Sequence, residues 1–111
     1  MTDAASTTYQ CLAADEAAAL IRGAAPVAIF DVRDLASYRR GHVAEAAHLS
    51  EDRHGGGLRR LPKDQAIVIY CFQGNASKTF AQMFVDFRFT RVVSVNGGYE
   101  PLAAALAGLP A

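Results

Sequence analysis

AIVIYCFQGNASK, residues 66–78, decides the fold because its character changes in the middle. Residues 66–70 are apolar and rich in β-branched side chains, which predicts a buried strand. Cys71 follows directly, and then comes a short loop in which Gly74 and Asn75 are expected to accept a positive φ. A helical pattern begins at Ser77. This order of strand, tight loop and helix presents a cysteine at the carboxyl end of a strand.

The sulfur of Cys71 is expected to lie in an electropositive place. Backbone N–H groups of the loop can turn towards it, and the positive end of the following helix points at the same spot. A free cysteine has a pKa of about 8.5, and environments of this kind lower it to roughly 3.5–7.5. We therefore predict that Cys71 is a thiolate nucleophile near neutral pH.

Short strands alternate with helices along the rest of the chain. Strands are predicted at 9–12, 27–32, 46–49 and 91–95, and helices at 14–22, 35–40, 77–87 and 99–107, with one helical turn at 58–61. The pattern is typical of an α/β fold in which a mostly parallel five-stranded sheet has helices on both faces. The helix 77–87 should pack through Phe80, Met83, Phe84 and Phe87. Ligands of such sheets bind outside the carboxyl ends of the strands, where Cys71 falls.

Composition excludes several classes of function. The chain has 111 residues, half of them hydrophobic, and a formal net charge of zero, so nucleic acid and anionic membranes are not expected partners. No stretch is long enough for a transmembrane helix, and residues 1–8 look like a flexible tail before a single domain at 9–111. Without a signal peptide the protein is expected in the cytoplasm, as a monomer by default, with reduced thiols. The sequence contains no CxxC motif, so it does not suggest a cysteine metal site, and Cys11 is expected to be structural.

Four motifs in this order carry a family resemblance. They are Asp31-Val32-Arg33, Tyr38 with Gly41-His42, residues 71–78, and residues 96–100. Together they resemble a rhodanese domain from about residue 9 to 106, and in particular the single-domain bacterial thiosulfate sulfurtransferases of the GlpE type. In that family the cysteine takes a sulfane sulfur from a donor such as thiosulfate, becomes a persulfide, and passes the sulfur to cyanide or a thiol.

The resemblance implies a role for each residue of the loop. Cys71 is the catalytic residue, and the sulfur is cradled by Phe72, Gln73, Gly74, Asn75, Ala76 and Ser77. No metal or organic cofactor is implied. The implied partners are a small-molecule sulfur donor and an acceptor that is a small thiol or a thioredoxin-like protein.

The loop departs from many active rhodaneses because it contains no basic residue, and its first cation is Lys78. This favours a small or protein-bound persulfide over thiosulfate, and we expect Gln73→Arg to improve the use of thiosulfate. A cysteine phosphatase needs Cys-x5-Arg, and Ser77 stands where the arginine would be. The alternative to an enzyme is a sulfur carrier or protein-interaction module of the same fold.

Other polar residues are expected to support the loop. Arg33 should hold its geometry through hydrogen bonds or pair with Asp31 or Asp34, and Gly97-Gly98 should let the backbone come close to it. His42, His48 and His54 are predicted to be structural or solvent-facing. The glycine run 55–57 is either a lid or a plain loop.

Overall fold

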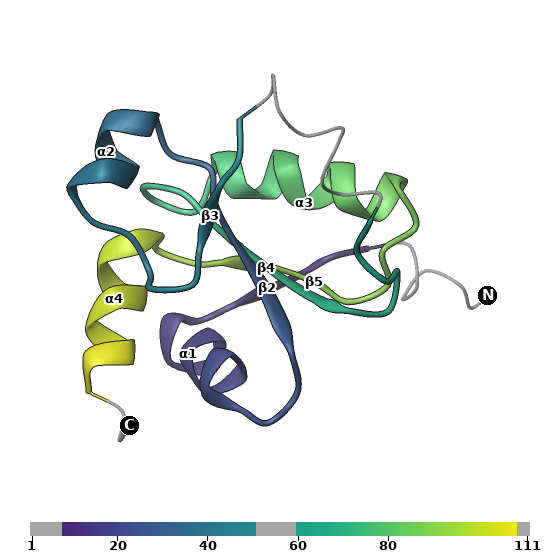
Figure 1. Ribbon diagram of the computed structural model, residues 1–111, viewed down its shortest axis with the longest axis horizontal. Coiled ribbons are helices and arrows are strands. Elements are labelled where there is room, and N and C mark those ends of the chain that lie inside the picture. The colour runs from purple at the N-terminus through teal and green to yellow at the C-terminus, as the bar shows by residue number, and fades with distance from the viewer. Residues whose placement is uncertain (1–7, 51–59, 109–111) are drawn as a thin grey trace.

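The computed structural model describes residues 8–50 and 60–108, which form a five-stranded sheet with helices on both faces (Figure 1). The strands, in chain order, are β1 (Gln10–Leu12), β2 (Val27–Asp31), β3 (Ala47–His48), β4 (Ala66–Tyr70) and β5 (Val92–Val95). They lie side by side in the order β1-β5-β4-β2-β3, and every neighbouring pair is parallel. The predicted "mostly parallel" sheet is thus wholly parallel.

Strand β4 is the centre of the sheet. It pairs with β2 on one side and β5 on the other, and Ile69 lies opposite Phe30 and Ser94. All five of its residues are buried. A strand covered on both faces must be apolar at every position, which is why an unbroken apolar run predicted it.

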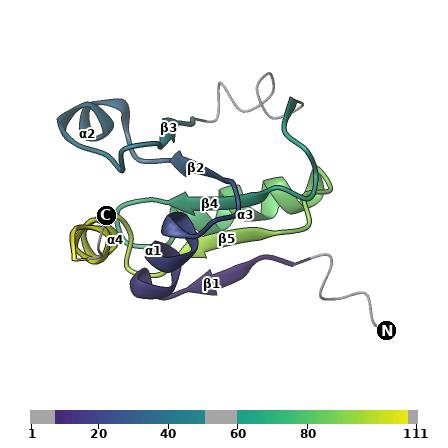
Figure 2. The same ribbon diagram turned by 60° about the horizontal axis from the view of Figure 1, so that its bottom comes forward.

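The helices divide between the two faces of the sheet (Figure 2). They are α1 (Ala14–Arg22), α2 (Leu35–Arg40), α3 (Ala76–Asp86) and α4 (Tyr99–Ala107). The predicted bounds of α1, α2 and α4 are confirmed, and α3 begins one residue earlier than predicted. Within residues 8–50 and 60–108, no helix is long and apolar enough to cross a membrane. The predictions for residues 1–7, His54 and 55–57 lie outside the described residues, as does most of the helical turn at 58–61.

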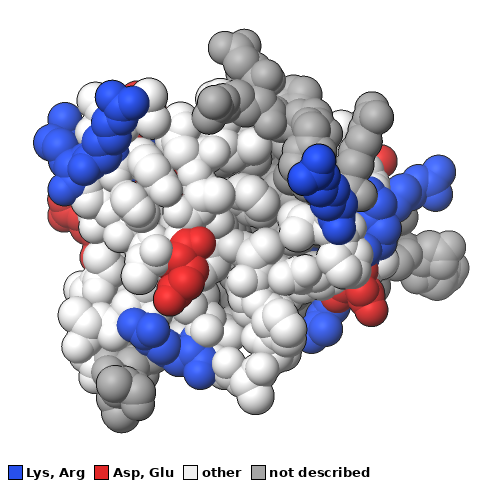
Figure 3. Space-filling view, in the orientation of Figure 1, with Lys and Arg blue, Asp and Glu red and all other residues white. Residues whose placement is uncertain are grey.

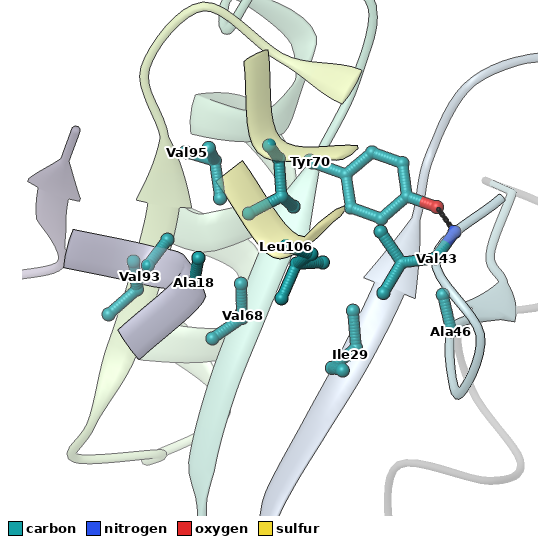
Figure 4. Packing of buried hydrophobic residues seen from close by; sticks show 11 residues of the cluster. Ala18, Ile29, Val43, Ala46, Val68, Tyr70, Val93, Val95 and Leu106 are labelled. Atoms are coloured by element: carbon teal, nitrogen blue, oxygen red, sulfur yellow. Dashed lines mark hydrogen bonds between the residues drawn. The ribbon is translucent and has the colours of Figure 1, made fainter. Parts of the chain in front are cut away.

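Each face of the sheet has its own core, because alternate side chains of a strand point to opposite faces. Val68 and Tyr70 pack with α1 and α4, whereas Ile67 and Ile69 pack with α3. The Tyr70 ring is fully buried, and its hydroxyl accepts a 3.0 Å hydrogen bond from the Val43 N–H (Figure 4). Leaving that N–H buried and unpaired would cost on the order of 1–3 kcal/mol, so this bond fixes the segment after α2 onto the core.

The end of α3 differs from the prediction. Phe84 is buried and Phe80 and Met83 pack against the core, as expected, but Phe87 is 40% exposed. Its place is taken by Phe89, which is 1% exposed and packs edge-to-face against Phe84 at 5.3 Å. The helix ends at Asp86, and Arg88 adopts a φ of 78°, so the chain turns and helical spacing no longer applies at position 87.

Candidate active site

Cys71 lies directly after β4, and only 3% of the residue is exposed. The Gly74 N–H donates a hydrogen bond to its sulfur at 3.1 Å. The Ser77 hydroxyl oxygen lies 3.4 Å from the same sulfur. A thiol can donate to that hydroxyl, and once ionised it can accept from it. The loop therefore surrounds the sulfur with uncharged donors, as predicted.

These contacts decide the protonation of the thiol. Burial by itself would raise the pKa of Cys71, because it disfavours the charged form. Hydrogen bonds from the Ser77 side chain and from the backbone of Ser77, Gly74 and Gln73 outweigh burial and lower the pKa below its ordinary value. The direction of the shift agrees with the predicted thiolate.

The turn of the loop depends on one glycine. Gly74 has a φ of 98°, as expected, and lies close to the backbone of Val95 and Gly97. Asn75, which was also expected to accept a positive φ, instead has a φ of −93°. The reason is that Asn75 is the N-cap of α3, which starts at Ala76, so its backbone is already near helical. The helix consequently directs its N-terminus into the loop.

A second backbone segment supports the loop from the end of β5. The Tyr99 N–H donates to the Cys71 carbonyl at 2.8 Å. A β-carbon on Gly98, whose φ is 80°, would overlap the backbone of Phe72 and Cys71. The predicted close approach of Gly97-Gly98 is confirmed, and it requires a residue without a side chain at position 98.

A buried pair of hydroxyls joins the site to β5. Ser77 Oγ and Ser94 Oγ are 2.8 Å apart, and both residues are fully buried. Cys71, Ser77 and Ser94 thus form a continuous chain of polar side chains. Sequence reasoning missed Ser94, because a serine inside a strand carries no signal of a contact with a helix on the neighbouring face.

Arg33 is committed to structure, as predicted, and its ion-pair partner is Asp31 rather than Asp34. Its guanidinium lies 2.7 Å from the Asp31 carboxylate, donates to the Gly41 carbonyl at 2.6 Å, and stacks on the Tyr99 ring at 4.0 Å. Burial opposes its charge, but the hydrogen bonds and charge of Asp31 outweigh this and raise the pKa of Arg33. Arg33 therefore ties β2, α2 and α4 together beside the loop.

Two hollows open beside the loop and share Arg33, Phe72 and Gln73 as walls. The hollow over Cys71, of about 480 Å³, is further lined by Val32, Asp34, Asn75 and Ala76. The other, of about 590 Å³, reaches Ser37, Arg40, Gly41, Gly97, Tyr99, Glu100 and Pro101. Of the six predicted cradle residues, Phe72, Gln73, Asn75 and Ala76 line the first hollow, while Gly74 and Ser77 contact the sulfur. Asp34 and Tyr99 were not predicted to line a hollow. In the sequence, Asp34 was considered only as a partner of Arg33, and Tyr99 only as part of the motif 96–100.

The remaining candidates make no hydrogen bond to the Cys71 sulfur among the described residues. His42 hydrogen-bonds the Tyr38 carbonyl at 2.7 Å, and His48 the Arg33 carbonyl at 2.7 Å, so both have structural partners as predicted. Cys11 was expected to be structural, but its side chain is exposed because β1 is an edge strand. In the described part of the chain, no three metal-ligating side chains gather.

Comparison with known proteins agrees with this architecture. A family model for the rhodanese-like domain matches residues 13–105. Among solved structures, a rhodanese-related protein of Thermoplasma volcanium is 20% identical, with a TM-score of 0.71 and coverage of 92% of this chain and 96% of that one. A rhodanese-like domain protein of Staphylococcus aureus is 24% identical, with a TM-score of 0.66 and coverage of 80% and 86%.

A third similar structure has a different description. It comes from Rhodopseudomonas palustris and is described as a protein of unknown function and possible tyrosine phosphatase. It is 24% identical, with a TM-score of 0.73 and coverage of 97% of this chain and 88% of that one. At this identity the likeness concerns the fold alone.

Proposed function

The chain belongs to the rhodanese-like domain family, which includes sulfurtransferases, and we propose that it transfers a sulfane sulfur through a persulfide on Cys71. In the first step the Cys71 thiolate attacks the outer sulfur of the donor. A new S–S bond forms, the donor's own bond to that sulfur breaks, and its remainder leaves with the electron pair, as sulfite does from thiosulfate. In the second step an acceptor thiolate or cyanide attacks the terminal sulfur and regenerates the Cys71 thiolate.

The observation that carries this proposal is the set of uncharged donors around the sulfur. The Gly74 N–H at 3.1 Å and the Ser77 hydroxyl at 3.4 Å stabilise negative charge without a cation. A persulfide keeps one negative charge, on its terminal sulfur, so such donors suit both states of the cycle. Phosphate chemistry needs more charge, and Ser77 occupies the place of the arginine that a cysteine phosphatase would use.

The partners and location complete the proposal. The donor is a small sulfane sulfur compound and the acceptor is a thiol, either small or on a thioredoxin-like protein. A thiolate nucleophile must stay reduced to work, which fits the cytoplasm expected from the sequence. The non-catalytic alternative is a domain that holds the sulfur but releases it only within a complex.

The test is the intact mass of the purified protein before and after a sulfur donor, and again after cyanide. We expect the parent protein to gain one sulfur atom, and cyanide to remove it with release of thiocyanate. Cys71→Ser should gain none. Cys11→Ser is the matched control, because it removes the other cysteine from an exposed edge strand, and it should behave like the parent.

Three results would contradict the proposal. Persulfide formation in Cys71→Ser would move the chemistry away from this loop. Hydrolysis of p-nitrophenyl phosphate that is lost in Cys71→Ser would favour a phosphatase. A stable persulfide that neither cyanide nor small thiols remove would favour the sulfur-carrier alternative.

A further inference from the structure

The hollow over Cys71 has mainly apolar walls. Val32, Phe72 and Ala76 line it, and Phe72 is 54% exposed directly beside the nucleophile. A large aromatic side chain left in water next to a reactive group is covered favourably by an apolar body, because the contact removes apolar surface from water. Thiosulfate offers no such body.

The charges on the walls of this hollow do not favour a dianion. The cation of Arg33 is held by Asp31, with both side chains buried. Asp34 is exposed and keeps its charge, because hydrogen bonds from the side chain and backbone of Ser37 lower its pKa. Arg40 also acts on Asp34, but it lines the other hollow, and Lys78 is not among the walls of either. On the face drawn in Figure 3, basic side chains lie at the α2 corner, below the centre and on the opposite side, and an acidic side chain lies near the middle.

We propose that the preferred sulfur donor is a monoanion with an apolar body, an organic persulfide or thiosulfonate, and that Asp34 discriminates against the thiosulfate dianion. This inference rests on the proposed function and adds a substrate class and a specificity residue to it. The chemistry balances without another reactant. An aryl thiosulfonate gives its outer sulfur to the Cys71 thiolate, its S–S bond breaks, and an aryl sulfinate leaves with the electron pair.

The electrostatic argument predicts a ratio. The interaction energy between Asp34 and a donor is proportional to the donor's charge. If the carboxylate lowers kcat/KM by a given factor for a monoanion, it should therefore lower kcat/KM by the square of that factor for a dianion. If removing the charge raises kcat/KM about twofold for a monoanion, it should raise it about fourfold for thiosulfate. Salt should shrink both effects, because exposed charges are screened.

The experiment compares thiosulfate with benzenethiosulfonate, each with cyanide as the acceptor. For the parent protein we expect kcat/KM to be at least about tenfold higher for benzenethiosulfonate, given the apolar area that it can bury. Asp34→Asn should raise kcat/KM more for thiosulfate than for benzenethiosulfonate, and the factor for thiosulfate should be the square of the factor for benzenethiosulfonate. Asparagine also caps helices well, so the start of α2, where the Asp34 carboxylate accepts from the Ser37 N–H at 3.1 Å, should stay intact.

Matched variants separate this effect from general changes. Asp86→Asn removes an exposed carboxylate that contacts Gln82 at the far end of α3, about 15 Å along the helix from Ala76. It should leave kcat/KM unchanged for both donors. Asp34→Ser tests the same charge with another capping residue. Gln73→Arg adds a cation to the wall shared by both hollows. It should raise the ratio of kcat/KM for thiosulfate to kcat/KM for benzenethiosulfonate, as Asp34→Asn should.

The outcomes distinguish the two proposals. Equal or better use of thiosulfate by the parent protein would overturn the donor class, and equal changes in kcat/KM for both donors in Asp34→Asn would overturn the role of Asp34. Both results would leave the sulfurtransferase in place. No persulfide on Cys71 from either donor would overturn both. A preference for benzenethiosulfonate that falls in Asp34→Asn and Asp34→Ser, but not in Asp86→Asn, would support the inference.

Discussion

Cys71 and Cys11 are the same residue type in opposite surroundings. Cys71 follows the central strand β4 and is buried, whereas Cys11 lies exposed in the edge strand β1. Cys11 stands opposite Ser94, whose hydroxyl belongs to the polar chain that ends at the Cys71 sulfur. The Cys11 sulfur has no hydrogen-bond donor among the described residues, whereas the Cys71 sulfur lies 3.1 Å from the Gly74 nitrogen and 3.4 Å from the Ser77 hydroxyl oxygen.

This difference shows that the loop, and not the residue type, gives Cys71 its hydrogen-bond donors. A thiolate inside a fold is stable only where donors replace the water that it has lost. The 71–77 segment supplies those donors because Gly74 turns the backbone inward and α3 begins at its end. The edge strand has no such turn, so Cys11 is an internal standard for every test of Cys71.

The largest effect should come from Gly98→Ala, which would make Cys71 resemble Cys11. The new β-carbon would overlap the backbone of Phe72 and Cys71, and alanine disfavours a φ of 80°. We expect a loss of at least about 2 kcal/mol in the free energy of unfolding and a collapse of Cys71 alkylation towards the Cys11 rate. Denaturant unfolding and iodoacetamide labelling with peptide mass spectrometry measure the two effects.

Gly108→Ala is the control for this prediction. Gly108, the C-cap of α4, has a φ of −85°, and an added β-carbon would lie 3.7 Å from its nearest neighbours. It should leave both stability and labelling nearly unchanged. If Gly98→Ala were as well tolerated as Gly108→Ala, the close approach of the two backbones would not matter for the loop.

A second, smaller effect should appear in the pH dependence of labelling. The pKa of Cys71 is lowered, so below the ordinary thiol pKa a larger fraction of it stays ionised, and its alkylation rate should fall less than that of Cys11 between about pH 8 and pH 6. Cys11→Ser and Cys71→Ser each leave one cysteine to measure. The low pKa also reduces the intrinsic nucleophilicity of the Cys71 thiolate, so its advantage in alkylation rate should shrink as the pH rises. Parallel profiles for the two cysteines would contradict a stabilised thiolate.

The smallest effect should come from the hydroxyls. Ser77→Ala removes a donor to the sulfur and should raise the pKa of Cys71, because the charged thiolate loses a hydrogen bond that favours it. Ser94→Ala acts only through Ser77 and should shift it less. Absorbance of the thiolate against pH, measured in the Cys11→Ser background, gives both values. A larger shift of the Cys71 pKa in Ser94→Ala than in Ser77→Ala would contradict the order Ser94, Ser77, Cys71 along this line of polar side chains.

The parts of the fold that were predicted correctly rest on local signals. The apolar run 66–70 predicted β4 to the residue, and the predicted bounds of α1 and α2 agree with the structure. The failures occurred where tertiary contacts override a local pattern. Phe87 continues the apolar spacing of α3, yet Phe89 fills the core because the chain turns at Arg88.

In the candidate site, too, the features set by local sequence were predicted and those set by tertiary contacts were not. Local order along the chain predicted the strand, the cysteine and the loop, together with a need for close backbone approach at Gly97-Gly98. The choice of Asp31 over Asp34 as the partner of Arg33 was not predictable, because both acids are within reach in sequence and only burial distinguishes them. The contact of Ser94 was not predictable either, because Ser94 lies in β5, 17 positions from Ser77 in α3, and only packing of the helix on the sheet brings the two hydroxyls together.

By itself, the amino-acid sequence determined the alternation of strands and helices, the family, and the cysteine that follows the central strand. These depend on hydrophobic period and on residues that act through their own backbone, both of which are local properties. The tertiary structure alone decided which charges are neutralised, which hydroxyls meet, and that Asp34 is among the residues that line the hollow over Cys71. Those properties depend on distances between segments far apart in the chain, and packing sets such distances only when the whole sheet has formed.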